Sequence, residues 1–213
     1  MADRLFPART DSLEQIVDNI DSALKEAGLS LDRLGGIGVG LGPGSWTGIR
    51  VGVTVGKMLA FSAGMPLAGV STLSALAYSA RDRARLICSV IGVGTRDMVY
   101  AAFFRRSGET VIQSGDYFVG SLSGLSEMIK ASLVMVGPQA NLYVSQIREK
   151  IDTGIKIVPV ETPPTGSAIA FLASERLQRG ESDEVLPLTP LYLKESTARA
   201  FTGRYTGNSR EVR

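Results

Sequence analysis

The sequence predicts an α/β fold, and three observations indicate it. Segments with the apolar spacing of strands alternate with segments of helical spacing along most of the chain, which is typical of mixed α/β proteins. A Gly-Pro-Gly-Ser turn at 42–45 separates a glycine-rich strand pattern from a helical pattern. The 213 residues, 44% hydrophobic and 21% charged, are also ordinary for a globular protein with a sizeable core.

The first half of the chain is predicted to form three helices and two strands. Asp11 and Glu14 have the spacing of a capping box, and Gly28 follows the last apolar residue of the helical pattern behind them. The elements expected here are a helix over about 12–27, a strand over 36–41, a helix over 46–63, a strand over 65–70 and a helix from 71 or 72 to about 81.

The second half is predicted to continue this alternation. Ser107 and Gly108 separate two strand patterns and indicate a hairpin. The elements expected here are strands over about 85–91, 98–105 and 110–118, a helix over 122–131, a strand over 133–136, a helix from 138, a strand over 155–160 and a helix over 165–179. Beyond them, 187–194 is expected to be an extended arm, and the polar chain from 196 a loose end.

Small residues recur at every fourth position of the helix predicted over 46–63. They share one face of that helix, and they are Gly48, Gly52, Gly56, Ala60 and Gly64. Because each interior glycine costs about 1 kcal/mol relative to alanine, we expect this face to pack closely against another element, first of all a helix. The other faces are apolar as well, so the helix is predicted to be buried in the core or against a second chain.

The glycine-rich turn before this helix could bind an anion, because unpaired backbone N–H groups lie at a helix N-terminus. The glycine spacings of the dinucleotide fingerprint and of the phosphate loop are absent, however, and so is Gly-x-Ser-x-Gly. A structural turn is therefore favoured over phosphate contact. Arg50 is the polar exception in the helix, with three roles open to it: binding a phosphate, binding a partner carboxylate or anchoring the turn.

The composition excludes several classes of function. The chain has no histidine, which removes a Ser-His-Asp triad, a Cys-His pair and the common histidine zinc sites. Its one cysteine, Cys88, allows no internal disulfide and is expected to be buried rather than nucleophilic. The net charge of +2 does not argue for a nucleic-acid partner. No signal peptide is expected, and no apolar run reaches roughly 18 residues. We therefore expect a cytoplasmic protein with no metal site and no membrane span.

The run from Gly42 to Gly52, GPGSWTGIRVG, resembles a family pattern. Together with Lys-Met-Leu-Ala at 57–60 and Gly-Val-Ser-Thr-Leu at 69–73, it is similar to the TsaB (YeaZ) family, whose pattern is Gly-Pro-Gly-Ser-Phe-Thr-Gly-x-Arg-x-Gly. Trp46 replaces the phenylalanine conservatively. The likeness runs in order over roughly residues 10–195.

This resemblance implies an actin-like, Hsp70-like ATPase fold (ribonuclease H-like) of two lobes that has lost enzymatic function. The lobes would be residues 1–84 and 85–195, followed by a flexible tail over 196–213. It further implies a non-catalytic scaffold for a TsaD-type catalytic subunit in bacterial tRNA threonylcarbamoyladenosine (t6A) synthesis. A TsaE-type ATPase would join through the complex, tRNA would be contacted indirectly, and a homodimer would use the same helices. No cofactor is expected in the isolated chain. ATP or ADP with Mg is expected only at the joint with the catalytic subunit.

Two departures from the family pattern are evident. The β-hairpin with which the family normally begins is missing ahead of Asp11, so the first lobe is expected to lack it and to expose apolar sheet edges. A misassigned or truncated start is favoured over a shortened variant. Near the middle, Val93-Gly94-Thr95 stands where the family has Asp-Ala-Arg, and Arg96 and Asp97 could substitute in part.

The resemblance and the glycine spacing together predict a partner surface on the first two helices. Its expected residues are Ile16, Ile20, Gly48, Val51, Gly52, Val55, Gly56, Leu59 and Ala60. Leucine at 52 or at 56 is expected to block pairing and to leave the monomer folded.

A second set of residues is expected to contact an anion or nucleotide at the joint with the partner. These residues are Gly42, Gly44, Ser45, Thr47 and Arg50. The alternative function, an active nucleotide-binding phosphotransferase or ATPase of the actin-like fold, would use this second set. A weaker alternative is direct tRNA contact through Arg199, Arg204, Arg210 and Arg213.

Overall fold

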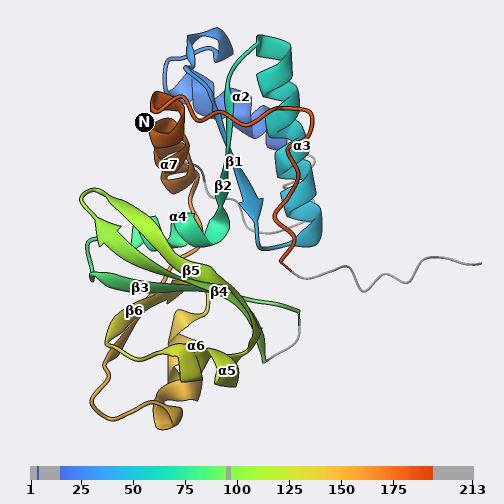
Figure 1. Ribbon diagram of the computed structural model, residues 1–213. Helices are drawn as coiled ribbons and strands as arrows, with labels where there is room; N and C mark the ends of the chain where they lie inside the picture. The colour runs from blue at the N-terminus through green and yellow to red at the C-terminus, as the bar shows by residue number, and fades with distance from the viewer. Residues whose placement is uncertain (1–3, 5–14, 95–96, 194–213) are drawn as a thin grey trace, which may run out of the picture.

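The computed structural model describes residue 4 and residues 15–94 and 97–193. These residues form two lobes, one above the other in Figure 1, and each lobe is built on its own β-sheet. The α/β class predicted from the sequence is confirmed. The expected capping box at Asp11 and Glu14 and the loose end from 196 lie outside the described residues.

The first lobe is built on two parallel strands with a helix on each face. Its elements are α2 (Ile16–Glu26), the 3-10 turn η1 (Leu31–Arg33), β1 (Ile37–Gly42), α3 (Trp46–Ala63) and β2 (Leu67–Ser71), joined from the end of the chain by α7 (Gly166–Gln178). In the sheet, Ile37 pairs with Leu67. As Figure 1 shows, α3 covers one face of the two strands and α7 the other. Within the described residues, no further strand joins the free edge of β1.

The predicted lobe boundary at residue 84 assigns α7 to the second lobe, whereas the structure packs it on the first. Ala173 of α7 is buried against Ala68 and Val70 of β2, so this helix, placed by sequence in the second lobe, packs on the first. A glycine allows the close approach, since a Cβ at Gly38 of β1 would lie 2.7 Å from the Cβ of Ala173. The order of elements along the chain does not reveal which sheet a late helix covers.

The second lobe contains a mixed five-stranded sheet in the order β5-β4-β3-β6-β7. Its elements are α4 (Thr72–Ser79), β3 (Leu86–Gly92), β4 (Met98–Ser107), β5 (Thr110–Ser121), α5 (Leu122–Met128), β6 (Leu133–Gly137), α6 (Ala140–Ile147), the turn η2 (Arg148–Lys150) and β7 (Ile157–Glu161). α4 packs on one face over Ile87 and Phe104. α5 and α6 pack on the other face over Cys88, which is fully buried as predicted.

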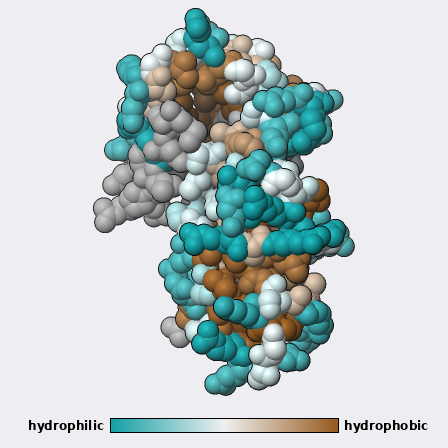
Figure 2. Space-filling model, turned by 90° about the vertical axis from the view of Figure 1, so that its left-hand side faces the viewer, coloured by the Kyte–Doolittle hydropathy of each residue, from teal (hydrophilic) through white to brown (hydrophobic). Residues whose placement is uncertain are grey.

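Two features of the outer surface bear on function. The connection between α4 and β3 and the tip of the β4–β5 hairpin project from the same side of the molecule, at the left of Figure 1. Figure 2 looks onto that side, where hydrophilic side chains form a band across the middle of the molecule. Separately, no helix among the described residues is long and apolar enough to cross a lipid bilayer.

Candidate partner-binding surface

The turn between β1 and α3 fixes where α3 begins. Gly42 has a φ of 95°, and a Cβ at this position would lie 2.7 Å from Cδ1 of Ile49, so only glycine fits here. The hydroxyl of Ser45 then accepts a hydrogen bond from the backbone N–H of Gly48 at 3.4 Å and caps the helix. The helix ends at Ala63 and is capped by Gly64, which adopts the left-handed conformation.

The inner face of α3 packs against the chain's own sheet. Val53 and Ala60 are 3% and 1% exposed, and a Cβ at Gly56 would lie 3.2 Å from side-chain atoms of Val39 in β1. Gly56 and Ala60, expected in the partner surface, are therefore core residues, which corrects that prediction. The close neighbour of Gly56 is a strand and not the helix that the glycine spacing suggested.

One flank of α3 remains half-open. We call it the α3 flank. Its residues lie along one side of the helix, are half-buried, and comprise Gly48, Val51, Gly52, Val55 and Leu59. Apart from its chain neighbours and the backbone of α3 itself, no described atom lies within 4 Å of a Cβ placed on Gly52. Five of the seven α3 residues expected to bind a partner thus lie together on an accessible surface.

The outer face of α3 is exposed in the single chain, so the chain's own core does not bury the helix all round. Burial against a second chain, the other predicted alternative, stays a prediction. Trp46, Met58 and Phe61 are 48%, 67% and 70% exposed. Side chains of this size on one helix are an unusual surface for a monomer, because exposed apolar patches generally mark interaction sites.

The apolar face of α2 is also incompletely covered. Ile16 and Ile20 are half-buried, Val17 beside them is 60% exposed, and no residue of the helix is buried. The sequence of α2 is nevertheless strongly amphipathic, because charged residues, among them Asp18, Asp21 and Lys25, occupy its other faces. An amphipathic helix normally buries its apolar face, so α2 offers a second apolar surface in the first lobe.

Arg50 is engaged within the chain. Its guanidinium carbon lies 3.8 Å from the centre of the Trp46 ring, and its Nε donates to the hydroxyl of Tyr192 at 3.1 Å. The rings of Trp46 and Tyr192 are 4.9 Å apart. Of the three roles open to Arg50, the structure shows an anchoring one, although the anchored segment is the C-terminal arm and not the turn.

The rest of the set expected to contact an anion is not assembled into one site. Gly42 is buried against Ile49, and the hydroxyl of Ser45 already caps α3. Gly44 and Thr47 are exposed. The structure therefore leaves two of the five residues free to face a ligand.

Sequence reasoning missed two residues that shape this surface. Nζ of Lys57 donates to the carbonyl oxygens of Leu186 at 2.7 Å and Leu188 at 3.0 Å, and Tyr192 packs on Trp46. Both hold the C-terminal arm along α3. A lone lysine within an apolar helix was the available signal for Lys57, whereas nothing in the sequence pairs Tyr192 with Arg50.

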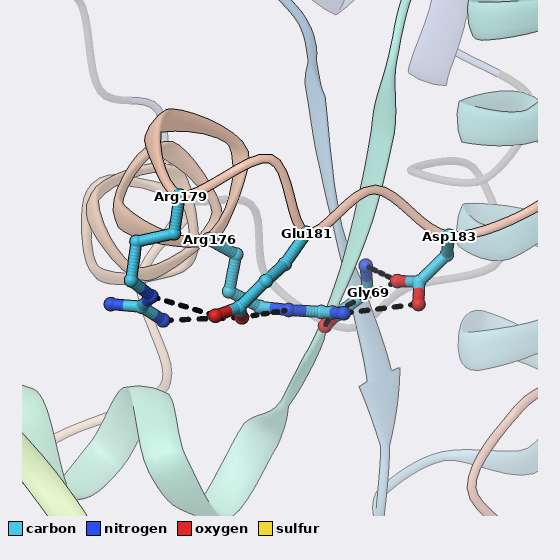
Figure 3. Close-up of polar contacts among 5 residues, drawn as sticks. All are labelled: Gly69, Arg176, Arg179, Glu181 and Asp183. Atoms are coloured by element: carbon cyan, nitrogen blue, oxygen red, sulfur yellow. Dashed lines mark hydrogen bonds and ion pairs between the residues drawn. The ribbon is translucent and has the colours of Figure 1, made fainter.

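Side chains close the outer edge of β2, as Figure 3 shows. Arg176 of α7 donates from Nη1 to the Gly69 carbonyl at 2.7 Å and forms two hydrogen bonds with the carboxylate of Asp183. That carboxylate also accepts from the Gly69 N–H at 2.7 Å, and the Asp183 N–H donates to Leu67. Burial alone would raise the pKa of Asp183, but the hydrogen bonds from Arg176 and Gly69 outweigh it and lower the pKa.

The comparisons with known proteins agree with this architecture. Residues 7–199 match the family model described as "TsaD: tRNA N6-adenosine threonylcarbamoyltransferase". A solved structure described as YeaZ from Pseudomonas aeruginosa superposes with a TM-score of 0.74 at 23% identity, covering 89% of this chain and 87% of the other. The molecule is thus one of the two-lobed proteins of the actin-like ATPase fold.

Curated relatives define the family more narrowly. The tRNA threonylcarbamoyladenosine biosynthesis protein TsaB of Bacillus subtilis is 30% identical over 185 residues, covering 85% of this chain and 79% of the relative. TsaB of Haemophilus influenzae is 26% identical over 210 residues, covering 92% and 86%. The chain belongs to the TsaB family, and the resemblance found in the sequence is confirmed.

Proposed function

We propose that this chain is a non-catalytic accessory subunit in the synthesis of threonylcarbamoyladenosine on tRNA, and that it binds a TsaD-type catalytic subunit. Membership of the TsaB family carries the proposal, because the relatives are named as biosynthesis proteins for this modification. The partner surface in the proposal consists of the α3 flank, the exposed apolar residues of α3 beside it, and α2.

The α3 flank supports this surface by its shape and chemistry. It lacks bulky side chains at Gly48 and Gly52, so a helix of the partner could approach the backbone of α3 closely. Val51, Val55 and Leu59 supply half-buried apolar area that association would remove from water. The same surface would serve a homodimer when the catalytic subunit is absent.

A scaffold role is supported by the lack of histidine in the sequence and by the burial of its one thiol. The chain has no histidine, and its one thiol, Cys88, is buried and has a pKa raised to about 12 by burial. The nucleotide-phosphotransferase alternative is less favoured because Arg50 and Ser45 are engaged within the chain. In this proposal ATP or ADP with Mg binds at the joint with the catalytic subunit, near Gly44 and Thr47. A TsaE-type ATPase joins through the complex, which acts in the cytoplasm.

Reconstitution of the modification tests the proposal. Unmodified tRNA would be incubated with the TsaD-type subunit, the other components of the pathway and the threonylcarbamoyl donor, with and without this chain. Nucleoside mass spectrometry would then measure threonylcarbamoyladenosine. We expect the modified nucleoside to accumulate only, or far faster, when the chain is present. An equal yield without the chain would contradict the proposal.

A further inference from the structure

Three exposed arginines gather where the α4–β3 connection meets the tip of the β4–β5 hairpin. This arginine cluster comprises Arg83, Arg85 and Arg106, which line one surface hollow together with Asp82 and Glu109. The neighbouring Arg105 faces the other side of the sheet, where its Nε donates to the hydroxyl of Ser114 at 3.2 Å. Both segments project from the side of the molecule that Figure 2 faces.

The carboxylates near the cluster leave most of its charge unbalanced. Arg106 forms ion pairs with Asp82 at 3.2 Å and Glu109 at 3.9 Å, and Arg81 lies 3.7 Å from the same Asp82. With Arg81 included, four guanidinium groups share two carboxylates, so two positive charges have no counter-charge. Those charges belong to Arg83 and Arg85, for which no ion pair is found among the described residues.

The backbone register brings like charges together instead of separating them. The N–H of Arg106 donates to the carbonyl of Arg85 at 3.0 Å, and Leu86 pairs with Arg105 in the β3–β4 ladder. Arg85 and Arg106 therefore lie across from each other, an arrangement that weakens a hairpin when both residues are cationic. This arrangement does not stabilise the fold. A bound anion, in contrast, would be attracted by both arginines.

We infer that the arginine cluster binds the phosphodiester backbone of RNA. A guanidinium presents a planar pair of donors that matches two phosphate oxygens, and the free cations here are all arginine. A protein interface usually centres on aromatic or large apolar anchors, and the hollow is lined by charged residues, glycine and Ala84 alone. Its chemistry therefore favours a polyanion over a protein surface.

This inference rests on the proposed function, which makes tRNA the substrate of the assembly. It goes further by giving the chain a direct contact with that tRNA, at a surface separate from the α3 flank. The contact would hold the tRNA against the complex through its backbone, without reading its sequence.

The test compares two variants with the same net charge. The first, R83Q/R85Q, removes the two arginines of the cluster without ion pairs. The control, R33Q/R148Q, removes two exposed arginines from elsewhere on the surface. Binding of fluorescently labelled, unmodified tRNA would be followed by anisotropy over a range of salt concentrations, for the complex with the TsaD-type subunit and for the chain alone.

We expect the cluster variant to bind tRNA about tenfold more weakly than wild type at 0.1 M salt. The slope of log affinity against log salt should fall by about 1.5, as expected for the loss of two phosphate contacts. The control should match wild type, and both variants should still pair with the catalytic subunit.

Equal tRNA affinity of the cluster variant and the control would overturn the inference. So would a cluster variant that binds tRNA normally and no longer pairs with the catalytic subunit, because the cluster would then be a protein interface. Failure of the wild-type chain to pair would count against the proposed function alone, since tRNA binding by the chain itself still tests the cluster.

Discussion

Gly52 and Gly56 lie one helical turn apart on α3 and have different surroundings. A Cβ at Gly56 would press on Val39 at 3.2 Å, whereas a Cβ at Gly52 would meet nothing within 4 Å. Gly56 therefore belongs to the packing of the monomer, whereas Gly52 lies on the surface proposed to bind a partner.

Leucine at these two positions should have opposite effects on stability. Gly56→Leu must push the β1 side chains aside, and we expect it to lower the free energy of unfolding by about 1–3 kcal/mol. Gly52→Leu replaces a poor helix former without a clash, so we expect no loss and a gain of up to about 1 kcal/mol. Urea denaturation of both variants measures this. Equal destabilisation by the two would contradict the assignment of Gly56 to the core and Gly52 to the open flank.

Cys88 should be inert in the folded protein. Burial raises its pKa to about 12, so at pH 8 a thiol reagent should modify the native protein only as fast as it unfolds. The thiol of the unfolded chain has a pKa of about 8.5. Below that pH, the contribution of this group to the free energy of unfolding should be fully present. Its contribution should then decline as the pH rises toward 12. Rapid modification without denaturant would show that the thiol is accessible.

At the scale of elements, the outer edge of β2 is closed by an isolated backbone bridge from Leu67 to Asp183 and by side chains, and not by a neighbouring strand. Asp183 and Arg176 satisfy both backbone groups of Gly69, and the side chains of this ion pair are only 26% and 30% exposed. The pair therefore takes the place of a neighbouring strand along part of β2.

Asp183→Ala should destabilise the first lobe. It leaves Arg176 and the Gly69 N–H without their partner, and we expect a loss of about 1–3 kcal/mol in the free energy of unfolding. Because the native pKa of Asp183 is lowered, its contribution should be present above the unfolded pKa of about 3.9 and be lost as the pH falls through the native pKa.

The matched control for this prediction is Glu181→Gln, whose side chain is 48% exposed. It should change stability by less than about 0.5 kcal/mol. Thermal unfolding of both variants at pH 7 and at pH 3 measures the difference. An Asp183→Ala variant as stable as the control at pH 7 would contradict the account of the β2 edge.

The elements themselves could be predicted because their signals are local. The capping serine and the left-handed glycine bound α3 at residues 46 and 63, where the sequence pattern also begins and ends the helix. What the sequence could not give were long-range contacts. The hydrogen bond from Arg50 to Tyr192 and those from Lys57 to the arm join residues more than 120 positions apart, and no periodicity encodes them.

The candidate site was predictable in part for the same reason. The spacing of small residues identified α3, but spacing alone does not separate its face toward β1 from its open flank. Gly56 and Gly52 are equivalent in the pattern, and only the packing of Val39 on one of them distinguishes core from surface. The arginine cluster was missed because its members come from two segments that the β3–β4 register brings together.

At the scale of the whole molecule, a late helix of the chain ties the two lobes together. α7 returns to the first sheet, and its Phe171 stacks on Tyr78 of α4 at 4.5 Å. The α3 flank lies in the upper lobe, and the arginine cluster belongs to segments of the lower lobe. One chain could therefore hold a catalytic subunit and a tRNA at separate surfaces.

The measurement that tests the central claim most directly is the mass of the complex with the TsaD-type subunit, by size-exclusion chromatography with light scattering. Wild type, Gly52→Leu and the control Gln146→Leu would be compared; Gln146 is exposed on α6 in the second lobe, away from the proposed partner surface. We predict a one-to-one complex for wild type and the control, and separate components for Gly52→Leu. Pairing of Gly52→Leu as strong as that of the control, or no pairing by wild type, would contradict the account.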